Sequence, residues 1–408
     1  MLFSDVIGQQ KTKQHLLEMV EQNRLSHALL FLGKEGNGAL SMALAFAQYI
    51  SLLPASSGGG GTTQTASLFG EAIEEVKPIY PKTADEADAF MQKQIAFSKA
   101  NNYVHPDIHF SYPVIPKKPG DKPVSTDYIN EWREFIQQYA YGNVYDWLQF
   151  IGAENKQGNI TAEECNDIIH KLNLKSFESP YKILVMWMPE YLGKEGNKLL
   201  KLIEEPPVDT LFILVAENED LILPTILSRC QLVKLNALET NDITDALIKR
   251  GNLEAGKAQQ IAAISQGNYR EALQLLQNAS EDWQSLLRDW LNAALKNGPS
   301  AQTKWIEEIN KLGREKQKQF LLYFIHLLQQ SIRIRFNGNN AISIAETEKD
   351  FAVRLNKIAS VNHQQAIIEE LNKAVYYIER NANAKMLFHA LTIKLYHIIK
   401  NNALILTD

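Results

Sequence analysis

Residues 197–235 read NKLLKLIEEPPVDTLFILVAENEDLILPTILSRCQLVKL, and this stretch decides the fold that we expect. Leucine and isoleucine recur at helical spacing over residues 199–203. Pro206 and Pro207 end that helix, because proline lacks a backbone N–H and clashes with the preceding turn. The continuous apolar run 211–216 is typical of a strand that is covered on both faces. The stretch therefore predicts a helix, a turn and a buried strand of an α/β domain.

The tripeptide Ser228-Arg229-Cys230 follows this strand and leads into another one. Arg229 comes just after the apolar pair Ile226-Leu227, at the end of an element from which its guanidinium can point outward. An arginine held at a rigid edge is what one molecule needs to stabilise the charge on a nucleotide that its neighbour binds. The alternative interpretation is an ordinary surface charge, which is the commoner case for a single arginine.

Length and composition exclude several classes of protein. A chain of 408 residues predicts two or three domains. A net charge of −5 gives no sign of a basic nucleic-acid-binding surface, so any contact with DNA is expected to be local or made by partners. Only Cys165 and Cys230 are present, which indicates a reducing compartment. With neither a secretory signal pattern nor a membrane-spanning run, we expect a cytoplasmic protein without a membrane partner.

The segment 27–52 has the layout of a phosphate-binding loop. An apolar strand, HALLFL, is followed by GKEGNG at 33–38 and then by a strong helix-forming run. In such a loop, backbone N–H groups and the helix N-terminus hold phosphates. Gly33 and Gly38 have the separation of the G-x-x-x-x-G-K-[ST] motif, and Gly36 lies between them.

The chemistry of that motif is missing. Ala39 stands where a lysine would reach the β- and γ-phosphates, and Leu40 stands where a hydroxyl would bind Mg²⁺. The loop is either an ordinary strand-to-helix turn or a degenerate P-loop that has lost catalysis. We favour the degenerate P-loop, because motifs elsewhere in the chain point the same way.

Five segments together resemble the clamp-loader branch of the AAA+ ATPases. In this family an Ile-Leu-Ser-Arg-Cys segment follows a Leu-Leu-Lys-x-Ile/Leu-Glu-Glu-Pro-Pro helix. The resemblance covers residues 1 to about 280 and is much weaker beyond them. The segments that carry it are 6–9 (VIGQ), 33–38 (GKEGNG), 197–207 (NKLLKLIEEPP), 226–230 (ILSRC) and 267–273 (GNYREAL).

The resemblance also identifies a degenerate Walker B motif and two sensor-like positions. Active relatives end the corresponding strand in Asp-Glu, where Trp187 and Met188 stand here, and Glu190 is displaced by two residues. Asn218 lies where the family places a polar sensor of the γ-phosphate, and Arg270 lies in the second sensor motif. Since the P-loop lysine is absent, we interpret Asn218 as structural and Arg270 as an inter-domain ion-pair partner.

The fold class implied by the resemblance is α/β plus all-α, in three parts. A RecA-like AAA+ P-loop domain with a parallel sheet is expected at 1–239, interrupted by an insertion at about 54–158 whose first part, 54–67, is of low complexity. A small helical lid is expected at 240–279, and a helical collar for oligomerisation at 280–408.

The resemblance further implies a role in DNA replication. The chain would be one subunit of a heteropentameric clamp loader in the DNA-directed DNA polymerase III holoenzyme, beside motor subunits of the tau/gamma type and a delta subunit. That complex uses ATP to open the sliding clamp and place it on primed DNA. ATP and Mg²⁺ would be bound by the partner subunits and no cofactor by this chain, which would donate Arg229 in trans.

Two other functions remain open. One is an active AAA+ ATPase, either a tau/gamma-like motor subunit or a branch-migration helicase, against which Ala39, Leu40, Trp187 and Met188 argue. The other is a structural scaffold in which Arg229 has no catalytic partner.

Metal sites are not expected. Relatives often carry a four-cysteine zinc module after the P-loop helix, but no cysteine precedes Cys165. The segment HPDIH at 105–109 places two histidines at helical spacing, but Pro106 argues against a helix there.

Several helices follow from local patterns. Thr161-x-x-Glu164 predicts a capping box at a helix start. The apolar stripe within 321–328 indicates either a bundle core, which is the commoner case, or an association with sister subunits. The helices expected after residue 280 span 283–295, 306–336, 351–358, 362–378 and 384–399.

Overall fold

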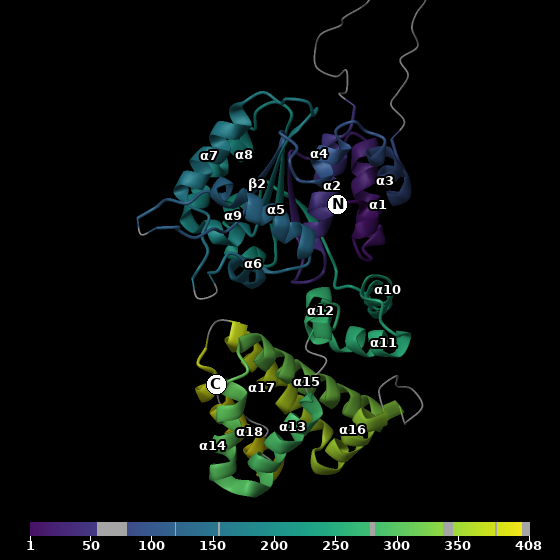
Figure 1. Cartoon of the computed structure of the whole chain (residues 1–408), viewed down its shortest axis with the longest axis vertical. Coiled ribbons are helices and arrows are strands. Elements are labelled where there is room, and N and C mark those ends of the chain that lie inside the picture. The colour runs from purple at the N-terminus through teal and green to yellow at the C-terminus, as the bar shows by residue number, and fades with distance from the viewer. Residues whose placement is uncertain are drawn as a thin grey trace, which may run out of the picture. The chain divides into compact units, whose positions relative to one another are not determined.

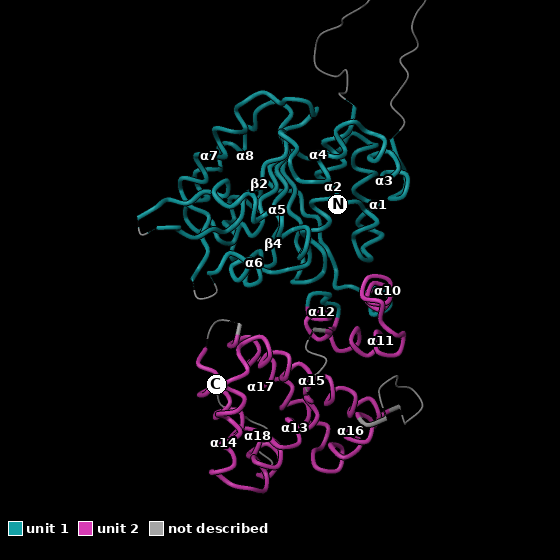
Figure 2. Tube along the Cα trace, viewed as in Figure 1, with its two compact units in different colours: residues 1–242, 267–270 teal, residues 243–266, 271–408 magenta. Residues whose placement is uncertain are grey.

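The computed structural model describes most of the chain as two compact units. Apart from Pro54, the low-complexity stretch 54–67 lies outside the described residues. The boundaries predicted for the lid (240–279) and the collar (280–408) remain predictions. Unit 1 comprises residues 1–242 and 267–270, and unit 2 comprises residues 243–266 and 271–408 (Figure 2). The described residues are 1–54, 80–118, 120–153, 156–277, 282–337, 346–379 and 382–401.

A five-stranded parallel sheet forms the centre of unit 1, in the order β2-β3-β4-β1-β5 (Figure 1). The central strand β1 pairs with β4, so that Leu32 lies opposite Ala216, and on its other side with β5. The predicted parallel sheet of the α/β class is therefore confirmed. Because all strands run the same way, their carboxyl ends meet at one edge. The strands are β1 (Ala28–Leu32), β2 (Ile108–Ser111), β3 (Lys182–Trp187), β4 (Thr210–Ala216) and β5 (Gln231–Lys234).

Helices cover both faces of this sheet (Figure 1). Successive side chains of a strand point to opposite faces, so Leu29 and Phe31 join one core and Leu30 joins the other. The first core is closed by α1 (Gln10–Glu21), α2 (Ala39–Ser51), α3 (Ala84–Gln92), α4 (Phe97–Asn101), α5 (Ile129–Gln138) and α6 (Val144–Phe150). The second is closed by α7 (Ala162–Asn173), the 3-10 helix η3 (Pro189–Leu199), α8 (Leu200–Glu204) and α9 (Pro224–Leu227).

Aromatic side chains attach the described part of the insertion to the sheet. Trp132 of α5 stacks on Tyr112 with a centroid separation of 4.1 Å and contacts Trp187 of β3 at 5.2 Å. The indole N–H of Trp147 donates a hydrogen bond to the carbonyl of Pro113 at 2.7 Å. These contacts place α5 and α6 next to the carboxyl end of β3.

The segment HPDIH fixes the loop before β3. The buried carboxylate of Asp107 accepts backbone N–H groups from Phe177 (2.6 Å), Glu178 (2.8 Å) and Ser179 (2.8 Å). A carboxylate that accepts several backbone N–H groups holds them in one geometry, so Asp107 joins the start of β2 to this loop. In the described part of the chain, no group of three His, Cys, Asp or Glu residues could hold a metal ion.

Only one of the two hydrogen bonds of the predicted capping box is present at the start of α7. The Thr161 hydroxyl accepts the N–H of Glu164 at 3.1 Å, as a helix cap should. The Glu164 carboxylate does not return to Thr161 but accepts the backbone N–H of Ser125 at 2.6 Å. Glu164 is buried under the insertion, so this tertiary partner replaces the local one.

Unit 2 is helical, and its long helix α15 lies at the centre of its core. The predicted single helix 306–336 is wrong, because α14 and α15 are separated at residues 311–313, where Gly313 has a φ of +80°. The elements are α10 (Thr240–Gly251), which begins in unit 1, α11 (Ala255–Ile264), α12 (Tyr269–Gln277), α13 (Trp283–Asn292), η5 (Ala293–Asn297), α14 (Gly298–Asn310), α15 (Arg314–Asn337), α16 (Glu346–Ile358), α17 (Val361–Glu379) and α18 (Ala384–Lys400).

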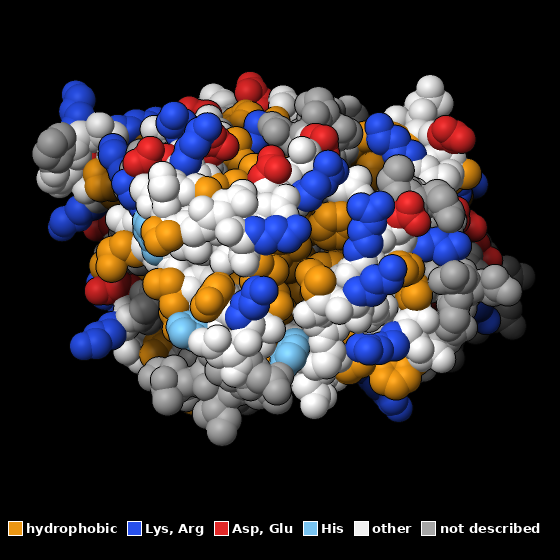
Figure 3. Space-filling view, turned by 90° about the horizontal axis from the view of Figure 1, so that it is seen from below, with side chains coloured by type: hydrophobic (Ala, Val, Ile, Leu, Met, Phe, Trp, Pro, Cys, Tyr) orange, Lys and Arg blue, Asp and Glu red, His pale blue; other side chains and the backbone are white. Residues whose placement is uncertain are grey.

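The apolar stripe of α15 belongs to this core. Leu321, Phe324, Ile325 and Leu328 are at most 1% exposed within the chain. The stripe is therefore explained by packing inside unit 2. Other apolar side chains remain exposed on α17 and α18, namely Tyr376, Tyr377, Met386, Ile393 and Tyr396. Figure 3 shows one face of the molecule on which apolar side chains lie among those of lysine and arginine. None of the described helices is both long enough and apolar enough to cross a membrane.

His326 on α15 makes unit 2 sensitive to acid. Burial, with a smaller contribution from the charge of Arg333, lowers the pKa of the His326 imidazole from 6.5 to about 4. The unfolded chain binds a proton in this window and the folded chain does not, so the free energy of unfolding falls as the pH decreases from 6.5 towards 4. We expect the free energy of unfolding of the His326→Phe variant to decrease less over this pH range, by up to roughly 3 kcal/mol.

Urea unfolding of both proteins, followed across this pH window, measures the effect. The exposed His15 provides the control variant His15→Phe, which removes an imidazole from the surface of unit 1. An unaltered slope in the His326→Phe variant would show that other groups cause the acid sensitivity.

Candidate functional site

The loop at residues 33–38 joins β1 to α2 at the carboxyl edge of the sheet. The N–H of Gly33 donates to the carbonyl of Ala216 at 3.0 Å, which ties the loop to the end of β4. Gly36 and Gly38 have φ angles of +70° and +90°, which side-chain-bearing residues rarely adopt. Strand, glycine loop and helix therefore have the order of a P-loop.

The side chain of Asn37 fills this loop from within. Its Oδ1 accepts the backbone N–H of Ala39 at 3.1 Å, and its Nδ2 donates to the carbonyl of Leu235 at 3.1 Å. A Cβ atom on Gly33 would lie 2.1 Å from the Asn37 amide nitrogen. The first N–H of α2, which would face a phosphate in a nucleotide-binding loop, thus has a partner inside the chain.

The cavity beside the loop is small. Its volume is about 20 Å³. A water molecule needs at least roughly 10–15 Å³, whereas ligand pockets are roughly 300–1,000 Å³. In this conformation the cavity has room for about one water molecule. It brings together the positions predicted from sequence at the loop and the Walker B strand, namely Gly33, Gly36, Gly38, Ala39, Leu40, Trp187 and Met188.

Arg270 is bound by two carboxylates from distant parts of unit 1. Its Nη1 lies 3.0 Å from Oε1 of Glu35. Its Nε and Nη2 donate to the two oxygens of Asp146 at 2.5 and 2.6 Å, in the forked geometry that suits guanidinium and carboxylate groups. The Arg270 side chain is only 4% exposed. Arg270, which the sequence placed at a sensor-like position, is therefore held by two acidic side chains of the chain itself.

Glu35 also accepts hydrogen bonds from two asparagines. The amide of Asn143 donates to its Oε2 at 2.8 Å, and that of Asn268 donates to its Oε1 at 3.1 Å. Sequence analysis missed Glu35, Asn143, Asp146 and Asn268 as members of the site. The one available signal was a negative charge inside a loop of the kind that binds phosphates.

The ends of β3 and β4 are joined by Glu190 rather than by a metal-binding pair. Its Oε1 accepts the backbone N–H groups of Glu217 at 2.7 Å and Asn218 at 2.9 Å, and burial raises the pKa of its carboxyl. The Asn218 side chain accepts the N–H of Asp220 at 3.0 Å and so caps a short turn. Met188, with a φ of +60°, turns the chain between β3 and η3.

Arg229 lies outside the loop cavity, at the end of α9. Its side chain is 30% exposed and forms an ion pair with Glu204 of α8. Its Nη1 also donates to the Ser228 hydroxyl at 3.3 Å. Cys230 is half-buried, and burial raises the pKa of its thiol to about 11. The two halves of the stretch 197–235 thus meet at the Arg229–Glu204 pair.

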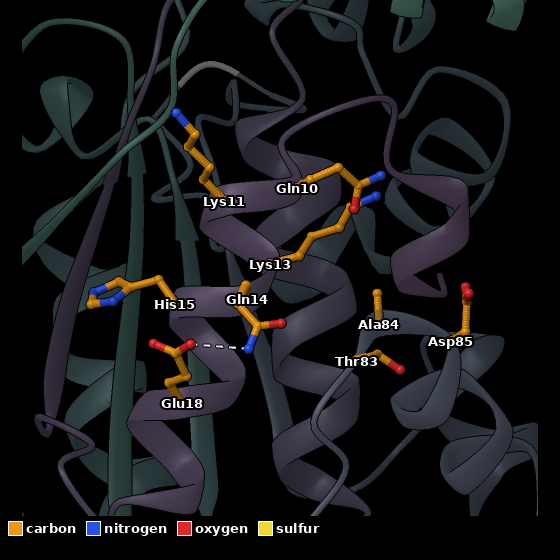
Figure 4. A pocket seen from close by; sticks show the side chains of 9 residues that line it. All are labelled: Gln10, Lys11, Lys13, Gln14, His15, Glu18, Thr83, Ala84 and Asp85. Carbon is orange, nitrogen blue, oxygen red and sulfur yellow. Dashed lines mark hydrogen bonds between the residues drawn. The ribbon is translucent and has the colours of Figure 1, made fainter.

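A larger cavity of about 590 Å³ lies between α1 and the start of α3. Figure 4 shows side chains of α1, from Gln10 to Glu18, together with Thr83, Ala84 and Asp85 around it. Lys13 donates to the carbonyl of Val6 at 2.6 Å, and Gln14 donates to Glu18 at 3.0 Å. The lining carries charges of both signs, and no motif of the sequence falls in it.

Comparison with known proteins gives sequence relatives. Residues 136–239 match the family model described as DNA polymerase III, delta subunit. DNA polymerase III subunit delta' of Bacillus subtilis is 25% identical over 270 residues, which are 66% of this chain and 60% of that protein. DNA polymerase III subunit gamma of Buchnera aphidicola is 25% identical over 288 residues, 60% of this chain and 78% of that protein. The chain thus aligns with less than two thirds of the Bacillus subtilis protein.

One shorter sequence match agrees with these. DNA polymerase III subunit delta' of Escherichia coli is 28% identical over 157 residues, 34% of this chain and 46% of that protein. Among solved structures, a DNA polymerase III gamma-subunit-related protein of Thermotoga maritima aligns with 94% of this chain and 99% of its own, with 14% identity and a TM-score of 0.34. The sequence matches support the resemblance to clamp-loader subunits that the motifs indicated.

Loss of the Arg270 side chain should destabilise unit 1. Arg270→Met keeps the length of the side chain but leaves Glu35 and Asp146 without their cation. Breaking a buried ion pair from one side costs about 3–5 kcal/mol, because an uncompensated charge remains. Urea unfolding of the full chain measures the loss. The exposed Arg24 gives the control Arg24→Met, and equal stability of the two variants would contradict a structural role for Arg270.

Proposed function

We propose that this chain, which is related in sequence to the clamp-loader subunits of DNA polymerase III, serves as the non-hydrolysing delta-prime subunit of that complex. In this role it supports the ATP-dependent loading of the sliding clamp onto primed DNA in the cytoplasm. Its partners are motor subunits of the tau/gamma type and the delta subunit. The clamp and the DNA are engaged through the whole complex.

The observation that carries the proposal is the state of the degenerate loop. Ala39 and Leu40 supply neither the phosphate-binding lysine nor the Mg²⁺-binding hydroxyl, and the cavity beside them measures about 20 Å³. Trp187 and Met188 provide no carboxylate for a metal. ATP and Mg²⁺ would accordingly be bound and used by the partner subunits.

The active contribution of the chain would be Arg229, donated in trans to the ATP site of the adjacent motor subunit. The guanidinium is partly exposed at the end of α9, and its partner Glu204 is 46% exposed. Such exposed ion pairs contribute only about 0–1 kcal/mol, so a phosphate group of the neighbour can take the place of Glu204 at little cost. The exposed apolar side chains of α17 and α18 fit an association of the helical region with sister subunits.

The trans role predicts that Arg229→Ala lowers the clamp- and DNA-stimulated ATPase of the reconstituted complex by roughly tenfold. This is less than the roughly 10³–10⁵ that an arginine finger contributes in GTPases, because the turnover is a composite of several ATP sites. A loss as large as tenfold requires that these sites work in a coupled cycle. Arg229→Lys should restore little, since lysine keeps the charge but lacks the planar fork.

Two controls accompany this experiment. Size-exclusion chromatography checks that the complex assembles, and the free energy of unfolding of the isolated variant should change by no more than about 1 kcal/mol. Arg24→Ala, which removes another exposed arginine, should leave turnover unchanged. If Arg229→Ala also left turnover unchanged in an assembled complex, the chain would be reduced to the scaffold considered from the sequence.

The proposal also predicts that the isolated chain does not bind Mg-ATP. The thermal midpoint should stay the same at millimolar nucleotide, whereas a motor subunit of the same complex should be stabilised. Binding at a hundredfold excess over Kd would add about 2.7 kcal/mol to the free energy of unfolding, which is easily measured. Stabilisation of this chain by Mg-ATP would favour the active ATPase alternative.

A further inference from the structure

The Glu35 carboxylate lies among three side-chain donors that come from separate parts of unit 1. Asn143 Nδ2 donates at 2.8 Å, Asn268 Nδ2 at 3.1 Å and Arg270 Nη1 at 3.0 Å. These donors are 108, 233 and 235 residues away from Glu35 in sequence. Two amides and one guanidinium that converge on two oxygens have the chemistry of an anion site.

The donors are held in place by a further set of contacts. Asp146 accepts hydrogen bonds from Nε and Nη2 of Arg270, so that Nη1 faces Glu35. Asn143 and Asp146 exchange hydrogen bonds with each other's backbone N–H groups, at 3.1 and 3.0 Å. The N–H of Tyr269 donates to the carbonyl of Gly36 at 3.0 Å, which draws this segment onto the loop. The site is therefore organised by groups other than Glu35.

We propose that Glu35 is a tethered anion that permanently occupies an anion-binding site beside the loop at residues 33–38. Because it is part of the chain, its carboxylate competes with any free anion at a high effective concentration. The Arg270 side chain is 4% exposed and that of Glu35 is 19% exposed, so the positive group is covered and the carboxylate borders the solvent. The chain thus carries its own ligand where a nucleotide-binding protein needs an external one.

This inference deepens the proposed function and rests on it in one respect, namely that the loop of the wild-type chain holds no nucleotide. Its own content is chemical. If the Glu35 carboxylate is removed, the Arg270 charge and the two amides should accept a small free anion of similar shape. The ligands that fit are formate, which replaces the lost carboxylate, and inorganic phosphate.

The experiment is a chemical rescue of Glu35→Ala in the full chain. Thermal unfolding should show a midpoint lower by roughly 5 °C, since a charge-assisted network has lost its acceptor. Amide hydrogen exchange should become faster in residues 33–40 and 267–270. Formate or inorganic phosphate at tens of millimolar should reverse at least half of both changes, compared with sodium chloride at the same ionic strength. The wild-type chain should show no response to either anion beyond that of sodium chloride.

Three further variants make the outcome specific. Glu35→Ala with Arg270→Met should show no recovery, because the cation is gone. Glu35→Gln keeps the shape of the side chain and still fills the site, so it should not respond to the anions either. The exposed Glu239 provides the matched control Glu239→Ala, which should behave like the wild type.

A folded Glu35→Ala variant without rescue would overturn the inference, and so would equal rescue of the double variant or of Glu35→Gln. If Glu35→Ala did not fold, the test would use Glu35→Gln alone. Recovery of Glu35→Gln on addition of formate or phosphate would then contradict the proposal. Faster amide exchange in residues 33–40 of Glu35→Gln, without recovery by either anion, would support it. Mg-ATP binding by the wild-type chain would instead count against the proposed function, so the two failures are distinguishable.

Discussion

Parallel pairing of β1 with β4 and β5 is the constraint on which the rest of unit 1 depends. It makes the carboxyl ends of the strands meet at one edge, so the loop after β1, Met188 after β3 and Glu217 after β4 line the same small cavity. Strands β3 and β4 are buried on both faces, which requires helices in two layers. The fold thus brings the site together before any of its polar side chains interacts.

At that edge, charged and polar groups of the chain pair with one another. A glycine loop followed by a helix and an arginine is an arrangement that attracts anions. Here Glu35 and Asp146 meet the arginine, and the Asn37 side chain meets the first N–H of α2. The Arg270 guanidinium and the N–H of Ala39 therefore have acceptors inside the chain, and these contacts stabilise the loop in this conformation.

The proposed roles of the chain are divided between two places. In the loop, the side chains of Glu35 and Asn37 are held by partners elsewhere in unit 1. Arg229 is on a different element, is partly exposed and is paired with Glu204 by a contact that solvent weakens. A subunit that keeps its own site rigid and offers one arginine to a neighbour needs such a separation, because changes at the neighbour's nucleotide must not disturb the fold that positions the arginine.

The sequence by itself predicted most of the helices and strands, and it identified the positions at which the residues of an active P-loop are replaced. Local backbone geometry explains the hydrophobic periodicity, the helix end at Pro206-Pro207 and the glycines of the loop. The positions of Ala39 and Leu40 differ from an active P-loop by a missing functional group. Features of both kinds can be read from neighbouring residues in the sequence. Individual strands and helices were predicted from these patterns, whereas the parallel sheet and the degenerate P-loop were what the resemblance to clamp-loader subunits implied.

Tertiary structure alone decided what fills the site. Glu35 and Arg270 are 235 residues apart, and an isolated glutamate or arginine looks the same in sequence whether it is solvated or paired. The same holds for Glu164, which leaves its local cap for Ser125. The partner of a long polar side chain depends on which distant segments the sheet brings together. A local sequence pattern does not contain that information.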